Sequence, residues 1–226
     1  MAEITLAVLI WLGTHLGLSS TPLRGVIVRG LGPSGFLAIY SLIATVAFVY
    51  LVYVYTAVPR EVYFWLPNPA LFWVPKVLMP LALIFILGGF LVRNPTLVGA
   101  ELKEDGAQEL ARGVTRITRH PLQWGMVLWA ASRIVVNGDL VSIVFFSAFA
   151  LLSLVGSALM DMKKARVFGS AWQAYAAVTS NIPFGAICAG RNQLKFSELW
   201  MPVLIGGVGY AVLWYFHESF TGTVVF

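Results

Sequence analysis

Six long apolar runs divide the chain, with short polar or proline-rich stretches between them. They cover residues 4–20, 35–58, 75–92, 121–136, 140–160 and 199–216. A helix needs about 20 mostly apolar residues to cross a bilayer, so each run qualifies or comes close. A helix also satisfies its own backbone in lipid, which favours helix even where Val, Ile and Phe are frequent. The pattern therefore predicts an all-α, polytopic membrane helical bundle of about six transmembrane helices.

The stretch 63–74 differs from these runs because it is rich in aromatic residues and proline. We interpret it as an interfacial segment that precedes the third span. No internal repeat or low-complexity tract interrupts the pattern, so we expect a single integral membrane domain over residues 1–226.

Composition agrees with membrane residence. The chain is 59% hydrophobic and 11% charged, with a mean hydropathy of +0.83, whereas soluble domains carry about 25% charged residues. This excludes a soluble globular enzyme and a disordered chain, and one cysteine, Cys188, excludes a disulfide scaffold. The net charge of +5 is scattered, so we expect no nucleic-acid partner.

The basic residues predict an orientation. The loops after the first, third and fifth runs carry twelve of the fifteen Lys and Arg residues, whereas Arg60, Lys76 and Arg133 lie on the opposite side. Because Lys and Arg favour cytoplasmic loops, we expect these three loops in the cytoplasm and both termini on the non-cytoplasmic side. The polar residues gather in two of these loops, so we expect the active face to be cytoplasmic.

Two of the three histidines can share a site. His15 lies inside the first run near its cytoplasmic end, and His120 begins the fourth run at the same side, whereas His217 closes the sixth run opposite them. Gly13 and Gly17 flank His15. This spacing indicates either close helix packing, with the imidazole bonded to a neighbouring carbonyl, or access of a flat cofactor such as haem to the imidazole.

The segment that begins at Arg119, His120 and Pro121 and continues to Trp124 predicts the start of a helix. A helix N-terminus favours an anion, so a ligand carboxylate or phosphate is one candidate occupant. The alternative is that Arg119, with Arg112 and Arg116, contacts lipid headgroups.

Acidic and aromatic residues follow the fifth run. Asp161 ends that run on the side of Arg119, which allows an arginine–carboxylate pair, either structural or part of a ligand site. Trp172 and Tyr175 are three residues apart on one face of a short predicted helix. We interpret them as interfacial anchors, with a ligand clamp as the alternative.

Several stretches resemble the NnrU membrane-protein family. They are residues 118–129 followed by the turn at 137–139, residues 11–15 with Arg24, and residues 35–42. The best known relatives are the plant 15-cis-ζ-carotene isomerases, which the ending 179–184 also resembles and which use haem b to isomerise a cis double bond. The family often has His at the position of Arg133.

This resemblance implies a haem-b-binding membrane protein. His15 and His120 are the candidate axial ligands of the haem and the candidate catalytic residues. The substrate would be an apolar, membrane-soluble small molecule near the cytoplasmic leaflet of a bacterial inner membrane. Bacterial members are associated by name with nitrite and nitric oxide metabolism, which implies a non-catalytic accessory protein as an alternative. Membrane lipid is a further expected partner, and the sequence is compatible with a homo-oligomer.

The same region is similar to the isoprenylcysteine and phospholipid methyltransferases. Arg119-His120-Pro121, Phe168-Gly169, Trp172, Tyr175 and Ile182-Pro183 carry this similarity. It implies S-adenosylmethionine as the cofactor, held by Arg119, His120 and Tyr175. The predicted cofactor-binding set over both resemblances is therefore His15, His120, Arg119, Asp161, Trp124 and Tyr175.

Overall fold

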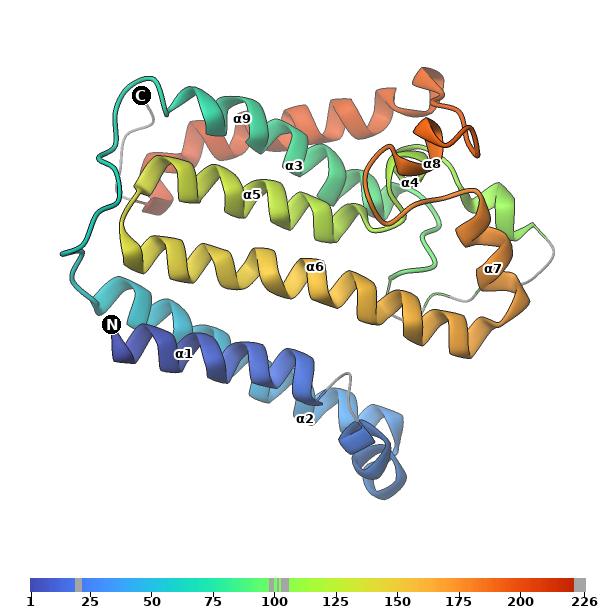
Figure 1. Cartoon of the computed structure of the whole chain (residues 1–226), viewed down its shortest axis with the longest axis horizontal. Coiled ribbons are helices and arrows are strands. Elements are labelled where there is room, and N and C mark those ends of the chain that lie inside the picture. The colour runs from blue at the N-terminus through green and yellow to red at the C-terminus, as the bar shows by residue number, and fades with distance from the viewer. Residues whose placement is uncertain (19–21, 98–99, 101, 103–105, 222–226) are drawn as a thin grey trace.

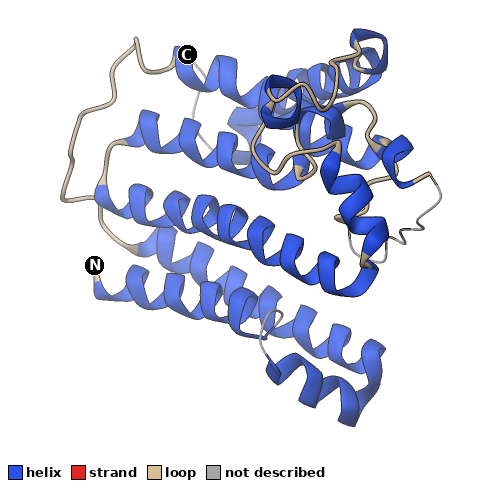
Figure 2. Ribbon diagram, turned by 45° about the vertical axis from the view of Figure 1, so that its right-hand side comes forward, coloured by secondary structure: helices blue, strands red, loops and turns tan. Residues whose placement is uncertain are grey.

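The computed structural model describes residues 1–18, 22–97, 100, 102 and 106–221. Its longer helices run side by side along one axis (Figures 1 and 2). They are α1 (Ala2–Leu12), α2 (Pro22–Ala57), α3 (Trp73–Leu91), α5 (Pro121–Asn137), α6 (Leu140–Phe168) and α9 (Trp200–Thr221). Each predicted apolar run falls on one of these helices, so the all-helical prediction is confirmed for the described part of the chain.

Short elements connect the long helices. A π-helical turn, η1 (Gly13–Leu18), continues α1, and η2 (Ala107–Leu110) and α4 (Val114–Ile117) lead into α5. Between α6 and α9 lie α7 (Ser170–Ala177), α8 (Gly185–Cys188) and η3 (Phe196–Glu198). Apart from η1, these connecting elements gather at the end of the bundle where α6 ends, which we call the loop end (Figure 1).

Three helices are long and apolar enough to cross a membrane, namely those over Leu23–Ala57, Trp73–Leu91 and Leu140–Phe168. The helix over Ala2–Leu18 is apolar but shorter. The described residues therefore support a membrane protein, and a count of six spans stays a prediction. The end of the first predicted run, residues 19 and 20, lies outside the described residues, as does Lys103 of the predicted cytoplasmic charge.

Two helices differ from the predicted runs. Helix α6 was expected to end at residue 160 but continues to Phe168, because Lys and Arg favour helix as well as leucine does and the apolar pattern marks only the lipid-facing part. Helix α2 begins well before residue 35, and it is broken at Gly32, whose φ of 72° and ψ of 170° are not helical. Pro33 follows the break, where its missing N–H costs little.

The turn between α5 and α6 forms as predicted. Gly138 ends α5 with a left-handed φ of 68°, and Asp139 accepts a hydrogen bond from the Ser142 amide at 2.8 Å to cap α6. The stretch from Val58 to Phe72 is not helical and crosses this end of the bundle, which we call the turn end (Figure 1). Its Phe64 amide donates to the Gly138 carbonyl at 2.9 Å.

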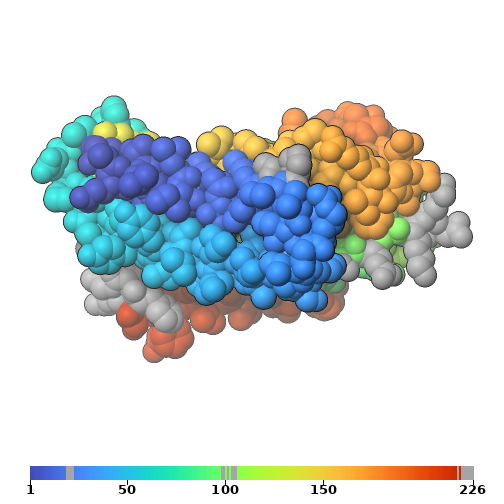
Figure 3. Space-filling model, turned by 90° about the horizontal axis from the view of Figure 1, so that it is seen from below, coloured from blue at the N-terminus to red at the C-terminus, as the bar shows by residue number. Residues whose placement is uncertain are grey.

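Helix α6 occupies the centre of the bundle. Helix α5 lies on one side of it and α1 and α2 on the other (Figure 1), and α1 and α2 together form one face of the molecule (Figure 3). The main apolar core joins these elements through Ile4, Trp11, Leu51, Phe145 and Phe149. A second core cluster, which includes Leu102, Ala107 and Trp172, packs α7 against the loop before α5.

Candidate functional site

His15 lies on the π-helical turn η1, at the loop-end side of α1. Its Nδ1 is 2.9 Å from the Trp11 carbonyl oxygen. Because a carbonyl only accepts, Nδ1 is the donor in this contact. The ring also packs against the Trp11 indole, with centroids 4.8 Å apart. The orientation of the imidazole is therefore held by its own helix, and π-helical turns are frequent at functional sites.

The predicted bond of His15 to a carbonyl is thus present, but the predicted close packing at its flanking glycines is not. A Cβ added at Gly13 or Gly17 would meet no described atom within 4 Å. These glycines do not bring a described helix backbone close to η1.

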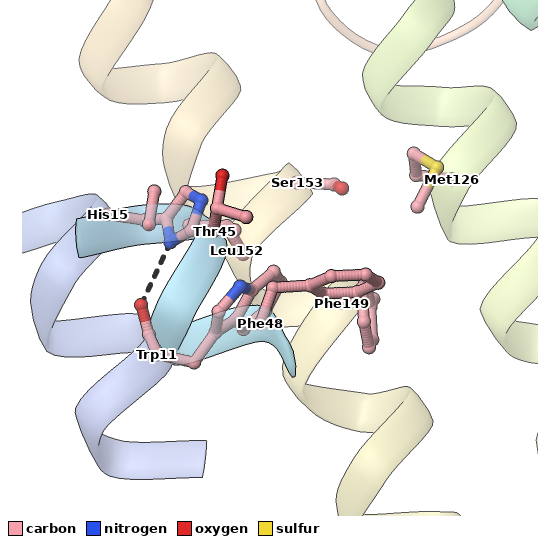
Figure 4. Close-up of a pocket in the computed structure, with 9 residues that line it drawn as sticks. Trp11, His15, Thr45, Phe48, Met126, Phe149, Leu152 and Ser153 are labelled. Carbon is pink, nitrogen blue, oxygen red and sulfur yellow. Dashed lines mark hydrogen bonds between the residues drawn. The ribbon is translucent and has the colours of Figure 1, made fainter. Parts of the chain in front are cut away.

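A cavity of about 370 Å³ lies beside His15 (Figure 4). Four helical segments supply its wall, which consists of Trp11, His15, Ala44, Thr45, Phe48, Met126, Phe149, Leu152 and Ser153. Thr45 and Phe48 are exposed at the surface, and both lie near the middle of the apolar part of α2. The cavity therefore reaches the surface at mid-span, where lipid tails rather than water surround a membrane helix.

Met126 forms the part of this wall that belongs to α5. Figure 4 shows its thioether across the cavity from His15, beyond the Phe149 ring of α6. Sequence reasoning missed Met126, Phe48 and Phe149, because nothing in a single apolar run marks which face borders a cavity. The one available signal was spacing: Met126 and Trp129 lie three residues apart and share a helix face.

His120 is the N-cap residue of α5 and is fully buried. It is not among the residues that line the cavity at His15. Its Nε2 lies 2.6 Å from Asp161 Oδ1, and its Nδ1 has no hydrogen-bond partner in the described part of the chain. The structure therefore does not bring His15 and His120 to one cavity as expected for two axial ligands of one haem.

Arg119 and Asp161 form the predicted pair between two helix ends. Arg119 Nη2 donates to Asp161 Oδ2 at 2.6 Å, and Arg119 Nε reaches both carboxylate oxygens at 3.0 and 3.1 Å. A third donor, Nη1, contacts the Thr179 carbonyl at 3.3 Å. The anion at this end of α5 is thus a carboxylate of the chain itself, and the pair connects α5, α6 and the segment after α7.

Trp124 and Asn181 extend this network. Trp124 Nε1 donates to the Asn181 carbonyl at 2.7 Å, and the Asn181 amide donates to Ser157 Oγ at 3.0 Å. We call Arg119, His120, Asp161, Asn181 and Ser157 the polar network. Sequence reasoning missed the roles of Asn181 and Ser157, since their partners lie far away in the chain.

Trp172 and Tyr175 do share a face of α7, but the prediction that they are interfacial anchors is wrong. Both are buried in the second core cluster, because η2 and the neighbouring Leu102 and Ala111 pack against α7. Arg119 lies over the Trp172 ring at 5.8 Å. Burial raises the pKa of Tyr175 above that of an ordinary tyrosine, so its hydroxyl stays neutral.

Arg116 is also paired within the protein rather than with lipid headgroups. It donates to both carboxylate oxygens of Glu198, at 2.7 and 2.9 Å, and to Asn192 at 2.7 Å. The Arg116 guanidinium holds the pKa of Glu198 below its usual value. This pair connects α4 to η3, so of the three arginines expected to meet headgroups, Arg116 and Arg119 have internal carboxylate partners.

An apolar helical bundle with spans of membrane length, a central α6 and polar contacts gathered at the loop end defines an integral membrane protein of the helical class. Within that class the chain belongs to the NnrU protein family, whose family model matches residues 3–225. No curated protein and no solved structure matches the chain. The family is thus the one the sequence motifs predicted, and it extends beyond the segments that carried the resemblance.

Proposed function

We propose that this NnrU-family protein binds an apolar, membrane-soluble ligand in the cavity at His15, and that haem b is the ligand to test first. The observation that carries the proposal is an imidazole, held by its own helix, in the wall of a largely apolar cavity. Histidines that ligate a metal usually donate their other ring nitrogen to a carbonyl or carboxylate, as His15 does to Trp11 at 2.9 Å.

The residues of the cavity fit a haem by their chemistry. An imidazole and a thioether are both iron ligands of haem proteins, and His15 and Met126 supply one of each from α1–η1 and α5. The rings of Trp11, Phe48 and Phe149 supply a water-excluding surface for a flat apolar group. His15 would hold the haem, Met126 would face it, and His120 would have no direct part.

The haem would supply reversible coordination of an electron-rich double bond, the chemistry that isomerisation of a cis polyene needs. The residues that line the cavity at His15 would hold an apolar substrate there and exclude water from it. The polar network has a positioning role in this proposal, because it fixes α5 against α6 and thereby the Met126 wall. Activity as an isomerase, at a cytoplasmic active face, is the finer form of the proposal.

The methyltransferase alternative would use Arg119, His120 and Tyr175 for S-adenosylmethionine. In this structure Arg119 and His120 are already engaged by Asp161, so no contact favours that alternative. It stays a prediction, as does an accessory role. A rise in the melting temperature with S-adenosylmethionine that Arg119→Ala abolishes would support the methyltransferase.

The test is the absorption spectrum of the purified protein, oxidised and reduced, before and after addition of haemin. We expect a Soret band that His15→Ala removes and that added imidazole restores, because free imidazole can replace the lost ligand. His217→Ala is the matched control, since His217 lies in the last two turns of α9, at the turn end. His120→Gln should keep the band in any fraction that elutes as folded protein.

Two results would contradict the proposal. Wild-type protein that shows no Soret shift with haemin would remove haem as the ligand. A band that survives His15→Ala but disappears in folded His120→Gln would assign the haem to the polar network. His120 would then be an axial ligand, as the sequence predicted.

A further inference from the structure

The side chains that line the cavity at His15 form two layers. Helices α1–η1, α2 and α6 each contribute one aromatic and one polar side chain, three or four residues apart, which is about one helical turn. The pairs are Trp11 and His15 on α1–η1, Phe48 and Thr45 on α2, and Phe149 and Ser153 on α6. We call the three aromatic side chains the aromatic layer and the three polar side chains the polar layer.

The direction of the helices places each layer on one level of the bundle. Helices α1 and α6 run towards the loop end, whereas α2 runs away from it (Figure 1). Because Thr45 precedes Phe48 while His15 follows Trp11, the polar residue of each pair is the one nearer the loop end. Figure 4 shows the same division, with the three polar side chains on one level and the three aromatic side chains on the other. The cavity is therefore amphipathic along the axis of the bundle.

The two hydroxyls of the polar layer are not used by the fold. A serine or threonine hydroxyl in a helix often donates to a carbonyl of its own helix, as Ser157 does to Leu154 at 2.8 Å. Thr45 and Ser153 make no hydrogen bond to any residue that the structure describes. A hydroxyl without a partner in apolar surroundings costs free energy, so the polar layer favours a ligand that supplies an acceptor.

The acceptor that suits these hydroxyls is uncharged. No Asp, Glu, Lys or Arg belongs to the described residues that line the cavity, and an ion without a counter-charge is costly within a membrane. A hydroxyl or carbonyl oxygen accepts from serine and threonine without that cost. The rings of the aromatic layer suit a flat conjugated hydrocarbon next to this oxygen, because aromatic side chains stack on such groups.

We propose that the cavity at His15 binds a neutral, flat, conjugated molecule with a hydroxyl or carbonyl oxygen, which Thr45 and Ser153 bind while the apolar body lies against the aromatic layer. This inference rests on the proposed function, which places an apolar substrate in the cavity, and it specifies the class of that substrate. It also specifies the orientation, since the oxygen points towards the loop end.

The test compares two fluorescent probes, diphenylhexatriene and its p-hydroxymethyl derivative, which adds one hydroxyl to the same polyene. Binding to the purified protein in phosphatidylcholine nanodiscs is measured by energy transfer from tryptophan, with probe expressed per lipid. We expect the alcohol to bind about fivefold more tightly than the hydrocarbon, since one neutral hydrogen bond contributes about that factor. Thr45→Val combined with Ser153→Ala should reduce this preference to below about twofold without weakening hydrocarbon binding.

The matched control is Ser41→Ala combined with Ser147→Ala. It removes one hydroxyl from each of the same two helices, at positions outside the cavity, and should keep the preference. Because each probe partitions into the lipid equally for all variants, a change in the ratio of the two affinities reports the cavity. A control that loses the preference as well would overturn the inference.

The remaining outcomes separate this inference from the proposed function. No preference for the alcohol in wild type, or a preference that survives Thr45→Val with Ser153→Ala, overturns the role of the polar layer but leaves the cavity as a binding site. Failure of both probes to bind, while haemin still gives a Soret band that needs His15, overturns the inference alone. Failure of both probes together with no Soret shift by haemin overturns the proposed function itself.

Discussion

Asp161 is the single acceptor that holds three parts of the chain together. Its two oxygens accept from Arg119 on one side and His120 on the other, and Asn181 approaches Oδ2 at 3.5 Å. Removing one partner of a shielded pair costs more than the pair contributes, because the remaining group keeps its desolvation cost. His120 is the group at risk, since it is fully buried.

We predict that Asp161→Asn lowers the stability of the detergent-solubilised protein by about 2 kcal/mol, less than for a fully buried pair because Asp161 and Arg119 are both partly exposed. A double-mutant cycle with Arg119→Gln should give a coupling of about 1 kcal/mol or more. The cycle of Asp139→Asn with Arg60→Gln, a looser pair at 4.0 Å, is the control and should give less. Additive effects at Asp161 and Arg119 would refute the structural role.

Single residues were predictable where chemistry and helix ends coincide. Arg119 and Asp161 could be paired from the sequence because each flanks an apolar run on the same side. His15 and His120 could not be separated in this way, since the sequence does not state which helices are neighbours. Met126 and Asn181 carried no local signal, because their importance comes from tertiary contacts.

Helix α9 packs on α3 through a glycine. A Cβ at Gly206 would come within 2.7 Å of Ile84 Cα and 2.8 Å of Ile84 N, whereas one at Gly207 would meet no described atom within 4 Å. Small residues let membrane helices approach closely. The adjacent glycines of α9 therefore offer a contact position and a matched control.

We predict that Gly206→Ala destabilises the protein by about 1–3 kcal/mol, because the methyl group must push the α3 backbone away. Gly207→Ala should be neutral or slightly stabilising, since alanine favours helix by up to about 1 kcal/mol over glycine. Thermal unfolding of both variants in the same detergent is the measurement. Equal effects of the two substitutions would contradict the α3–α9 contact.

Elements were predictable in type and in approximate place, but less so in detail. The apolar runs identified the long helices because hydrophobicity determines what lipid accepts. The π-helical turn η1 and the break at Gly32 were not predicted, since both depend on backbone geometry within a continuous apolar run. The extension of α6 to Phe168 was missed because charged residues beyond the lipid still form helix.

At the scale of the whole molecule, exposed residues at the two ends of the bundle allow its orientation in the membrane to be measured. Cys188 is exposed on α8 at the loop end, and Glu61 is exposed in the connection at the turn end. The basic residues of the sequence predict that the loop end is cytoplasmic. The single native cysteine makes this prediction directly measurable.

We predict that a membrane-impermeant maleimide labels Cys188 in inside-out vesicles and not in right-side-out vesicles. The control is Glu61→Cys in a Cys188→Ser background, which should label with the opposite preference. The expected contrast follows from the excess of Lys and Arg in the loops at the loop end. Labelling of both cysteines from one side would rule out a bundle that spans the membrane with this axis.

The arrangement of the helices was less predictable from the sequence than the single residues or the elements. Hydropathy predicts the order of the apolar helices but not their neighbours, because lipid-facing and buried apolar residues look alike in the sequence. The central place of α6, with α5 on one side and α1–α2 on the other, was therefore not foreseen.

Because Thr45 and Phe48 bring the cavity to the surface halfway along α2, exchange of the proposed ligand would be a two-dimensional process. A molecule would arrive by diffusing among acyl chains, and its occupancy would follow its mole fraction in the bilayer rather than its concentration in water. Titrations should accordingly be scaled to total lipid or detergent, since empty micelles compete for the same solute.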